Sequence, residues 1–285
     1  MQYRTDLAME LDEEFGGNLS ENELYREETC FGLMKLMRIE IRGDRAKETL
    51  GKPKGVYVTA VLPPLSDCDE ELEEYACHIG DTLQTMLPPN GTVLVAGLGN
   101  LAITPDALGP QSASMVLATR HIEGEFARAA GLDDLRPTAV IAPGVLGKTG
   151  VETGEILRGI CQVVHPTAVI AIDALAAHSV ERIGCTVQLC NSGISPGSGV
   201  GNHRKALDQS LLGVPVLAVG VPTVVDAHVI AAELGGGNGC NGGGMMVTPR
   251  EIDLIIQRAS KVIAMAINHA LQPHYSPLEL ITVAG

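Results

Sequence analysis

The sequence predicts an α/β protein with a mostly parallel β-sheet and helices on both faces. Four segments share one pattern, an apolar run of β-type residues that ends in small residues: 91–99, 137–144, 166–173 and 214–222. Near-continuous apolar strands are typical of parallel sheets covered on both faces. Helix-like stretches lie between these segments, and such alternation indicates parallel strands joined by right-handed crossovers.

The chain before residue 55 is more charged and less regular than the rest. Within and just after it, segments 33–41 and 55–62 have strand-like composition, so we expect them to add edge strands next to an amino-terminal arm. The whole chain has 285 residues, of which 45% are hydrophobic and 19% charged. That is enough for a substantial core, and we predict a single α/β domain over residues 7–285.

Connecting helices are predicted at 105–124, 152–164 and 173–183. A longer helix is expected to run to residue 271, because Thr248, Pro249 and Glu251 supply an N-cap, a first-turn proline and a capping box. We expect its apolar residues to lie in the core or at a subunit interface. The glycine-rich segment 235–244 before it is predicted to be a flexible loop.

Composition excludes several classes of function. A formal net charge of -14 leaves no basic patch for direct nucleic-acid binding. The amino end lacks a signal peptide and no apolar run is long enough to cross a membrane, so we expect a cytoplasmic protein without a membrane partner. Seven cysteines form no C-x-x-C pair, and the histidines form no ligand motif. These patterns predict free thiols, no metal site and no cofactor.

Two aspartates in the same D-A-L context, Asp106 in TPDALGP and Asp173 in AIDALAA, each follow an apolar strand and precede a predicted helix. Ligands of open α/β sheets bind at the carboxyl ends of the strands, so we expect both carboxylates in one crevice. A single aspartate there is commonly a helix cap. Two close carboxylates instead favour sharing a proton, which supplies an acid and a base. We assign the base to Asp106, in a helical first turn, and the acid to Asp173.

Two glycine-rich motifs suggest nucleotide binding as an alternative. GLGNLA (97–102) satisfies a dinucleotide-binding pattern, but Thr104 and Pro105 place the helix start several residues later. APGVLGKT (142–149) differs by one residue from a P-loop, and AVIAID after it resembles a magnesium-binding strand. Pro143 and Gly150 argue against a phosphate-binding helix there.

The segment 191–204, NSGISPGSGVGNHR, is expected to form a loop after another strand. Its consecutive main-chain N–H groups are suited to an extended peptide or a developing oxyanion. Its serines lie in no G-x-S-x-G elbow and are expected in a plain turn. The candidates for substrate binding are Gly99 and Asn100 beside Asp106, together with Ser195, Gly197 and Ser198 in this loop.

Nine motifs occur in one order along nearly the whole chain: RTDLA, VLVAGLGN, TPDALGP, TRH, PGVLGKTG, AIDALAA, SGISPGSGVGN, GVPTVVDA and MVTP. In this series the chain resembles the germination protease family of endospore-forming bacteria. The resemblance implies a fold like that of hydrogenase-maturation peptidases, a homotetramer, and cleavage of small acid-soluble spore proteins at germination in the spore core. It also implies that Asp106 and Asp173 are the catalytic pair.

The resemblance further implies a zymogen that cuts its own amino end. RTDLA resembles the processing site, so we predict cleavage between Asp6 and Leu7, with residues 1–6 as the pro-segment. Its acid, apolar, alanine order is similar to the target sites in the spore proteins. A short ordinary arm is the alternative. Other members have a longer pro-segment and a longer insert before MVTP.

Two other functions stay open on the sequence alone. One is a P-loop-like nucleotide-binding switch, which calorimetry with nucleotides tests. The other is a catalytically silent scaffold of the same fold, which a peptide-cleavage assay tests.

Overall fold

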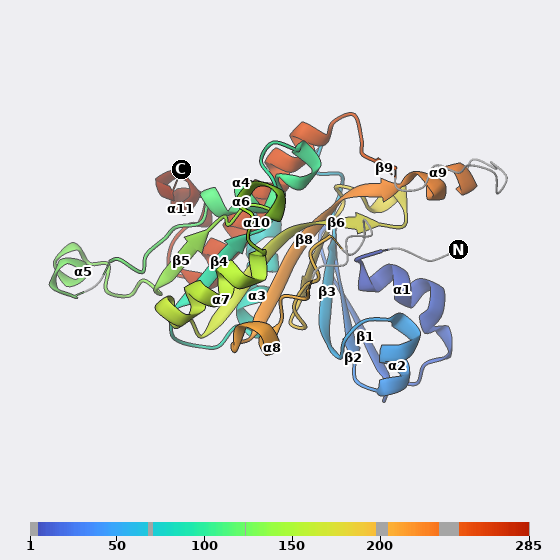
Figure 1. The fold of residues 1–285 in the computed structure, drawn as a ribbon, viewed down its shortest axis with the longest axis horizontal. Coiled ribbons are helices and arrows are strands. Elements are labelled where there is room, and N and C mark those ends of the chain that lie inside the picture. The colour runs from blue at the N-terminus through green and yellow to red at the C-terminus, as the bar shows by residue number, and fades with distance from the viewer. Residues whose placement is uncertain (1–4, 68–70, 123, 198–204, 234–244, 285) are drawn as a thin grey trace.

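The computed structural model describes residues 5–67, 71–122, 124–197, 205–233 and 245–284, which form a nine-stranded sheet with helices around it (Figure 1). The strand order is β1-β2-β3-β7-β8-β6-β4-β5, and β9 pairs with β8. The strands are β1 (Leu24–Phe31), β2 (Met34–Ile41), β3 (Gly55–Val61), β4 (Val93–Gly97), β5 (Thr138–Ile141), β6 (Ala168–Ala177), β7 (Thr186–Cys190), β8 (Val216–Asp226) and β9 (Met246–Val247).

The sheet is mixed rather than mostly parallel. β5, β4, β6 and β8 are parallel, as the four apolar runs predict. β1, β2, β3, β7 and β9 make antiparallel pairs. β1 and β2 are joined by Gly32 and Leu33 alone, with Gly32 at φ 56°, and a connection this short allows only antiparallel pairing. The expected edge strands at 33–41 and 55–62 are therefore present as β2 and β3.

The α-helices are α1 (Ala8–Phe15), α2 (Asp44–Leu50), α3 (Leu72–Met86), α4 (Leu108–Ser114), α5 (Gly124–Ala130), α6 (Leu146–Thr149), α7 (Thr153–Val164), α8 (Gln209–Leu212), α9 (Ala227–Glu233), α10 (Ile252–Leu271) and α11 (Pro277–Ala284). Short 3-10 helices are η1 (Gly16–Asn18), η2 (Thr104–Asp106) and η3 (Val180–Arg182). In the described part of the chain, no helix combines the length and the apolar character needed to cross a membrane.

Helices cover both faces of the sheet, which confirms the α/β class. Side chains alternate along β4, so that Val93 and Val95 join the cluster that contains α3 and α10. Leu94 and Ala96 point the other way and pack in the cluster with α7 and α8. The parallel strands are thus buried on both faces of the sheet.

Two predicted helices match the structure closely. The segment 152–164 forms α7, and the helix predicted from 249 to 271 forms α10. α10 begins at Ile252 with Glu251 at its N-cap and no side-chain cap, so the N-cap assigned to Thr248 is wrong. The Thr248 hydroxyl instead donates a hydrogen bond to the carbonyl of Thr223 at 2.8 Å.

Two other helix predictions need correction. Among the described residues of the segment 105–124, helix is limited to the end of η2, the short α4 and the first residue of α5. The segment 173–183 is not a helix, because β6 continues to Ala177 with Asp173 opposite Gly220 and Ala177 opposite Val225 on β8. Only η3 is helical there. Asp173 therefore lies inside a strand, not in front of a helix.

The amino-terminal arm is part of the core. Leu7, Ala8 and Met9 are at most 1% exposed and pack in one cluster with side chains of β1, β2, β3 and β6. Removal of this part of the arm would open the cluster. The predicted glycine-rich loop at 235–244 lies outside the described residues.

Candidate active site

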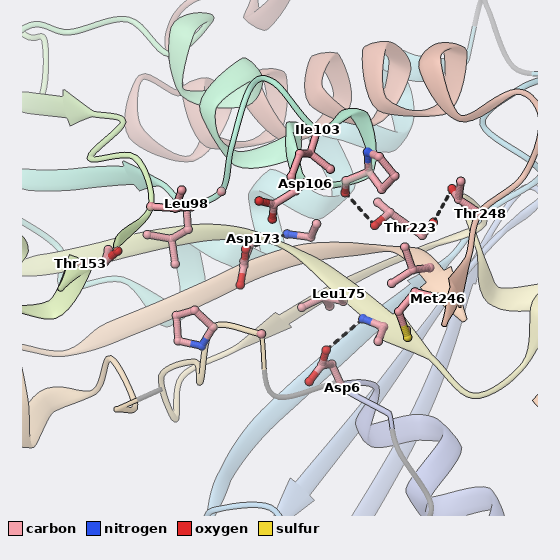
Figure 2. A pocket seen from close by; sticks show the side chains of 18 of the residues that line it. Asp6, Leu98, Ile103, Asp106, Thr153, Asp173, Leu175, Thr223, Met246 and Thr248 are labelled. Carbon is pink, nitrogen blue, oxygen red and sulfur yellow. Dashed lines mark hydrogen bonds between the residues drawn. The ribbon is translucent and has the colours of Figure 1, made fainter. Parts of the chain in front are cut away.

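A cavity of about 340 Å³ lies where β4, β6 and β8 approach their carboxyl ends, and both Asp106 and Asp173 line it (Figure 2). The structure therefore brings the two predicted catalytic residues into one crevice. This is the place where open α/β sheets bind ligands. The lining residues are Asp6, Leu98, Gly99, Ile103, Pro105, Asp106, Gly144, Val145, Thr153, Asp173, Ala174, Leu175, Ala176, Pro196, Gly197, Thr223, Val224, Met246 and Thr248.

Asp173 is held within the sheet. It pairs with Gly220 of β8, its side chain is largely buried, and Oδ1 accepts a hydrogen bond from the N–H of Ala174 at 3.0 Å. The neighbouring strand β4 ends at Gly97, opposite Ile172. Just after it, the N–H of Leu98 donates a hydrogen bond to the carbonyl oxygen of Ile172 at 2.8 Å. β6 therefore extends beyond β4, and Asp173 is the first residue of this extension.

Asp106 reaches the same cavity from η2. Its N–H donates to the carbonyl of Ile103 at 2.8 Å, and its carbonyl accepts from the N–H of Asn100 at 2.9 Å. Gly99 has φ 115°, a conformation that favours glycine, and a Cβ there would lie 2.1 Å from the Asp106 carbonyl oxygen. Gly109 is similarly tight, since its Cβ would lie 2.2 Å from the carbonyl oxygen of Leu98. Two glycines thus allow η2 and α4 to rest on the ends of β4 and β6.

Two threonines join η2 to the opposite wall of the cavity. The hydroxyl of Thr223 on β8 donates to the Pro105 carbonyl at 2.8 Å, and Thr248 donates to Thr223 in turn (Figure 2). The sequence reasoning missed both residues as parts of the site. The available signal was their presence in the motifs GVPTVVDA and MVTP.

The amino-terminal arm contributes Asp6 to the wall. Its N–H donates to the carbonyl of Ala176 at 2.9 Å, and its Oδ2 accepts from the N–H of the same residue at 2.9 Å. Leu7 is fully buried and does not line the cavity. Of the two residues of the predicted cleavage site, Asp6 thus lines the cavity and Leu7 packs in the core.

The candidates for substrate binding divide into three groups. Gly99 and Gly197 line the cavity with the two aspartates. Asn100 and Ser195 do not line it; Asn100 supports the turn, where its Oδ1 accepts from the N–H of Ala102 at 3.1 Å, and Ser195 is exposed. Ser198 lies outside the described residues.

Neither glycine-rich motif has the geometry of a nucleotide-binding loop. α6, which contains Lys148 and Thr149, is four residues long and ends at Gly150 in the left-handed conformation. A P-loop lysine opens a longer helix whose N-terminus faces the phosphates. The Thr149 hydroxyl is engaged in its own turn, where it bonds to the carbonyl of Val151 at 2.9 Å. After GLGNLA, the first helical element is η2 at Thr104, beyond the glycines.

Comparisons with known proteins show the family of this chain. The profile described as germination protease matches residues 6–234. The germination protease of Clostridium perfringens (strain ATCC 13124) is 38% identical over 311 residues, with 95% of each chain covered. That of Caldanaerobacter subterraneus subsp. tengcongensis is 39% identical, with 97% of this chain and 96% of the relative covered.

In two further matches, the aligned region covers a smaller share of one of the two proteins. The germination protease of Priestia megaterium is 44% identical over 206 residues, which is 70% of this chain and 55% of the relative. A solved [NiFe] hydrogenase maturation protease from Thermococcus kodakarensis is 16% identical with a TM-score of 0.38, covering 65% of this chain and 98% of that one. By its profile match and its relatives, this chain belongs to the germination protease family and is a protease.

Proposed function

We propose that this protease is an endopeptidase that starts the degradation of small acid-soluble spore proteins at germination, in the spore core. The observation that carries the proposal is the cavity shared by Asp106 and Asp173. Two carboxyl groups facing one cavity supply a base and an acid, because close like charges favour one protonated partner. The family and the order of its motifs support the substrate.

In the proposed reaction, the Asp106 carboxylate takes a proton from water while the water oxygen bonds to the substrate carbonyl carbon. Asp173 then gives its proton to the leaving nitrogen as the C–N bond breaks. Asp106 is the more exposed carboxyl and lies in a helical first turn, which favours the anion. Asp173 is 5% exposed, and we assign the shared proton to it.

The direct test is incubation of the full chain with a purified small acid-soluble spore protein, followed by mass spectrometry of the products. Discrete internal fragments are expected. A substrate that stays intact, with a chain that is folded and has been given time to process, overturns the proposal. Titration with ATP and NAD in a calorimeter tests the nucleotide-binding alternative, and no heat of binding is expected.

We also propose that the chain removes residues 1–6 by cutting between Asp6 and Leu7. Asp6 already lies in the cavity wall, beside Ala176. Ala176 is three residues beyond Asp173 on β6, about 10 Å along a strand. Processing therefore requires the arm to move, or a second chain to cut it. Amino-terminal sequencing at two protein concentrations distinguishes these routes, and a chain that keeps Met1 or Gln2 overturns both.

The homotetramer is proposed from the resemblance alone. The apolar residues of α10 pack inside this chain, in the main core. They therefore lie in the core rather than at a subunit interface, the other place expected for them from the sequence. Light scattering coupled to size-exclusion chromatography tests the assembly. A single species near 29.9 kDa at micromolar concentration contradicts it.

A further inference from the structure

The pairing of β6 with β8 is irregular beside the cavity. Leu175 lies opposite Pro222, and the next pair is Ala176 opposite Val224. Thr223 is therefore an extra residue on β8, as in a β-bulge. Bulges bend a strand and re-aim a side chain, and they are frequent next to active sites. Proline, which has no N–H to give to the ladder, is tolerated in a sheet at such a place, and Pro222 directly precedes the extra residue.

The side chain of this extra residue bonds to the peptide group that precedes Asp106. The Thr223 hydroxyl donates to the Pro105 carbonyl at 2.8 Å, and Thr223 is 1% exposed. The N–H of the same peptide group, which belongs to Asp106, donates to the carbonyl of Ile103 at 2.8 Å. Both polar groups of the Pro105–Asp106 peptide are therefore bonded, one of them to β8. Thr223 and Asp106 line the cavity together.

Thr248 holds the extra residue from the side of β9. β9 pairs antiparallel with β8, and Val247 lies opposite Val225. Continued two residues further along β8, this register would place Pro249 opposite Thr223, and proline has no N–H to donate. The Thr248 hydroxyl donates to the Thr223 carbonyl at 2.8 Å instead. Figure 2 shows this bond and the bond to Pro105 in one line from β9 through β8 to η2.

We propose that Thr223, held by Thr248, is a positioning residue for Asp106 in the hydrolytic reaction. The inference rests on the proposed function in one respect, that Asp106 is a catalytic carboxylate. The bond from Thr223 joins β8 to η2, so it fixes the main chain of Asp106 relative to the sheet that carries Asp173. A misplacement of about 1 Å in an active site is enough to lower the rate about a hundredfold, so loss of this bond should lower kcat.

Steady-state cleavage of the spore protein by the full chain tests this role. Thr223→Val keeps the shape of the side chain and removes its hydroxyl, so kcat should fall at least about tenfold while KM changes less than about twofold. Thr223→Ser restores the donor and should recover most of kcat.

Thr186→Val is the matched control for the loss of a buried hydroxyl. Thr186 lies on β7 and is fully buried, and its hydroxyl donates to the carbonyl of Arg182 in η3 at 3.0 Å. Like Thr223, it connects a strand to a 3-10 helix, but neither Thr186 nor Arg182 lines the cavity. The control should therefore leave kcat unchanged.

Two further measurements separate positioning from a loss of stability. In a chain that carries Asp106→Asn, adding Thr223→Val should lower kcat by less than about twofold, because positioning acts through a carboxylate that is already absent. Hydrogen exchange needs no substrate. Thr223→Val should speed exchange at the N–H groups of Asn100 and Asp106, which bond to the carbonyls of Asp106 and Ile103, and Thr186→Val should not.

Three outcomes overturn the proposal. They are wild-type kcat in folded Thr223→Val, an equal loss of kcat in Thr186→Val, and a loss from Thr223→Val that is as large in the Asp106→Asn chain as in the wild type. Should Thr223→Val fail to fold, Thr248→Val removes the bond that holds Thr223 and should lower kcat by a smaller factor, and wild-type kcat in it overturns the proposal.

Failure of the proposed function gives a different result. A wild-type chain that never cuts the spore protein removes that function, and hydrogen exchange then decides the role of Thr223 alone. Faster exchange at Asn100 and Asp106 in Thr223→Val would show that Thr223 holds η2 in place. Unchanged exchange would overturn the positioning role as well.

Discussion

Gly99 and Asp106 approach each other so closely that a Cβ on residue 99 would lie 2.1 Å from the Asp106 carbonyl oxygen. The contact joins the end of β4 to η2, which are separated by a turn in the chain. It holds the main chain of Asp106, a residue that lines the cavity, against the turn that follows β4. Site geometry in this protein thus depends on a residue that has no side chain.

Gly99→Ala should therefore damage activity. The substitution adds a Cβ where φ is 115° and where the Asp106 main chain must move aside. We expect a loss of about 2 kcal/mol or more in the free energy of unfolding, and a more than tenfold loss of cleavage rate. Gly147→Ala is the matched control, since its Cβ would meet nothing within 4 Å. Wild-type activity in folded Gly99→Ala would show that the Asp106 position is not critical.

Asp106→Asn and Asp173→Asn should each lower kcat for cleavage of the spore protein by at least about a hundredfold, because each removes one partner of acid–base catalysis. The double variant should have a kcat only slightly below that of the slower single variant, since the two aspartates act as a unit. Asp44→Asn, at an exposed ion pair on α2, should retain full activity. Near wild-type cleavage rates in either single variant, with folding confirmed by circular dichroism, would contradict the assignment of Asp106 and Asp173 as the catalytic pair.

Glu10 connects the arm to the end of β6, and its substitution should destabilise the fold. Its carboxylate accepts from the N–H groups of His178 and Ser179, each at 2.8 Å, and from the Thr5 hydroxyl, and it is 2% exposed. Glu10→Gln replaces one acceptor by a donor that faces another donor, so we expect a loss of about 2 kcal/mol in urea unfolding. Glu13→Gln breaks only an exposed pair with Arg182 and should cost less than about 1 kcal/mol. Equal losses in both variants would refute this account.

The cysteine thiols of this chain should differ in how fast they are alkylated. Burial raises the pKa of the Cys190 thiol, and burial together with Glu73 and Asp81 raises the pKa of Cys77. A raised pKa leaves a smaller thiolate fraction at any pH below it, and the thiolate is the reactive form. Iodoacetamide at mildly alkaline pH should therefore modify the exposed Cys30 before Cys190, as read by peptide mapping. Modification of Cys190 first would mean that β7 opens in solution.

Local patterns in the sequence were sufficient for much of the fold and for the family. The apolar runs at 91–99 and 214–222 predicted β4 and β8, because strands buried on both faces exclude polar residues at every position. The helices α7 and α10 follow from patterns within their own residues. The order of the motifs indicated the germination protease family, which the comparisons confirm.

Contacts between distant segments decided the rest. Residues 173–177 have helix-forming composition, but pairing with β8 and burial keep them in β6. Thr248 resembles an N-cap, yet its hydroxyl bonds to Thr223. The place of Asp6 beside Ala176 has no local signature, because main-chain atoms far along the chain supply its partners. Sequence therefore determined which segments are buried and that the two acids share one crevice. Only tertiary packing decided which other groups line that cavity, since their hydrogen bonds form between residues whose separation along the chain carries no pattern.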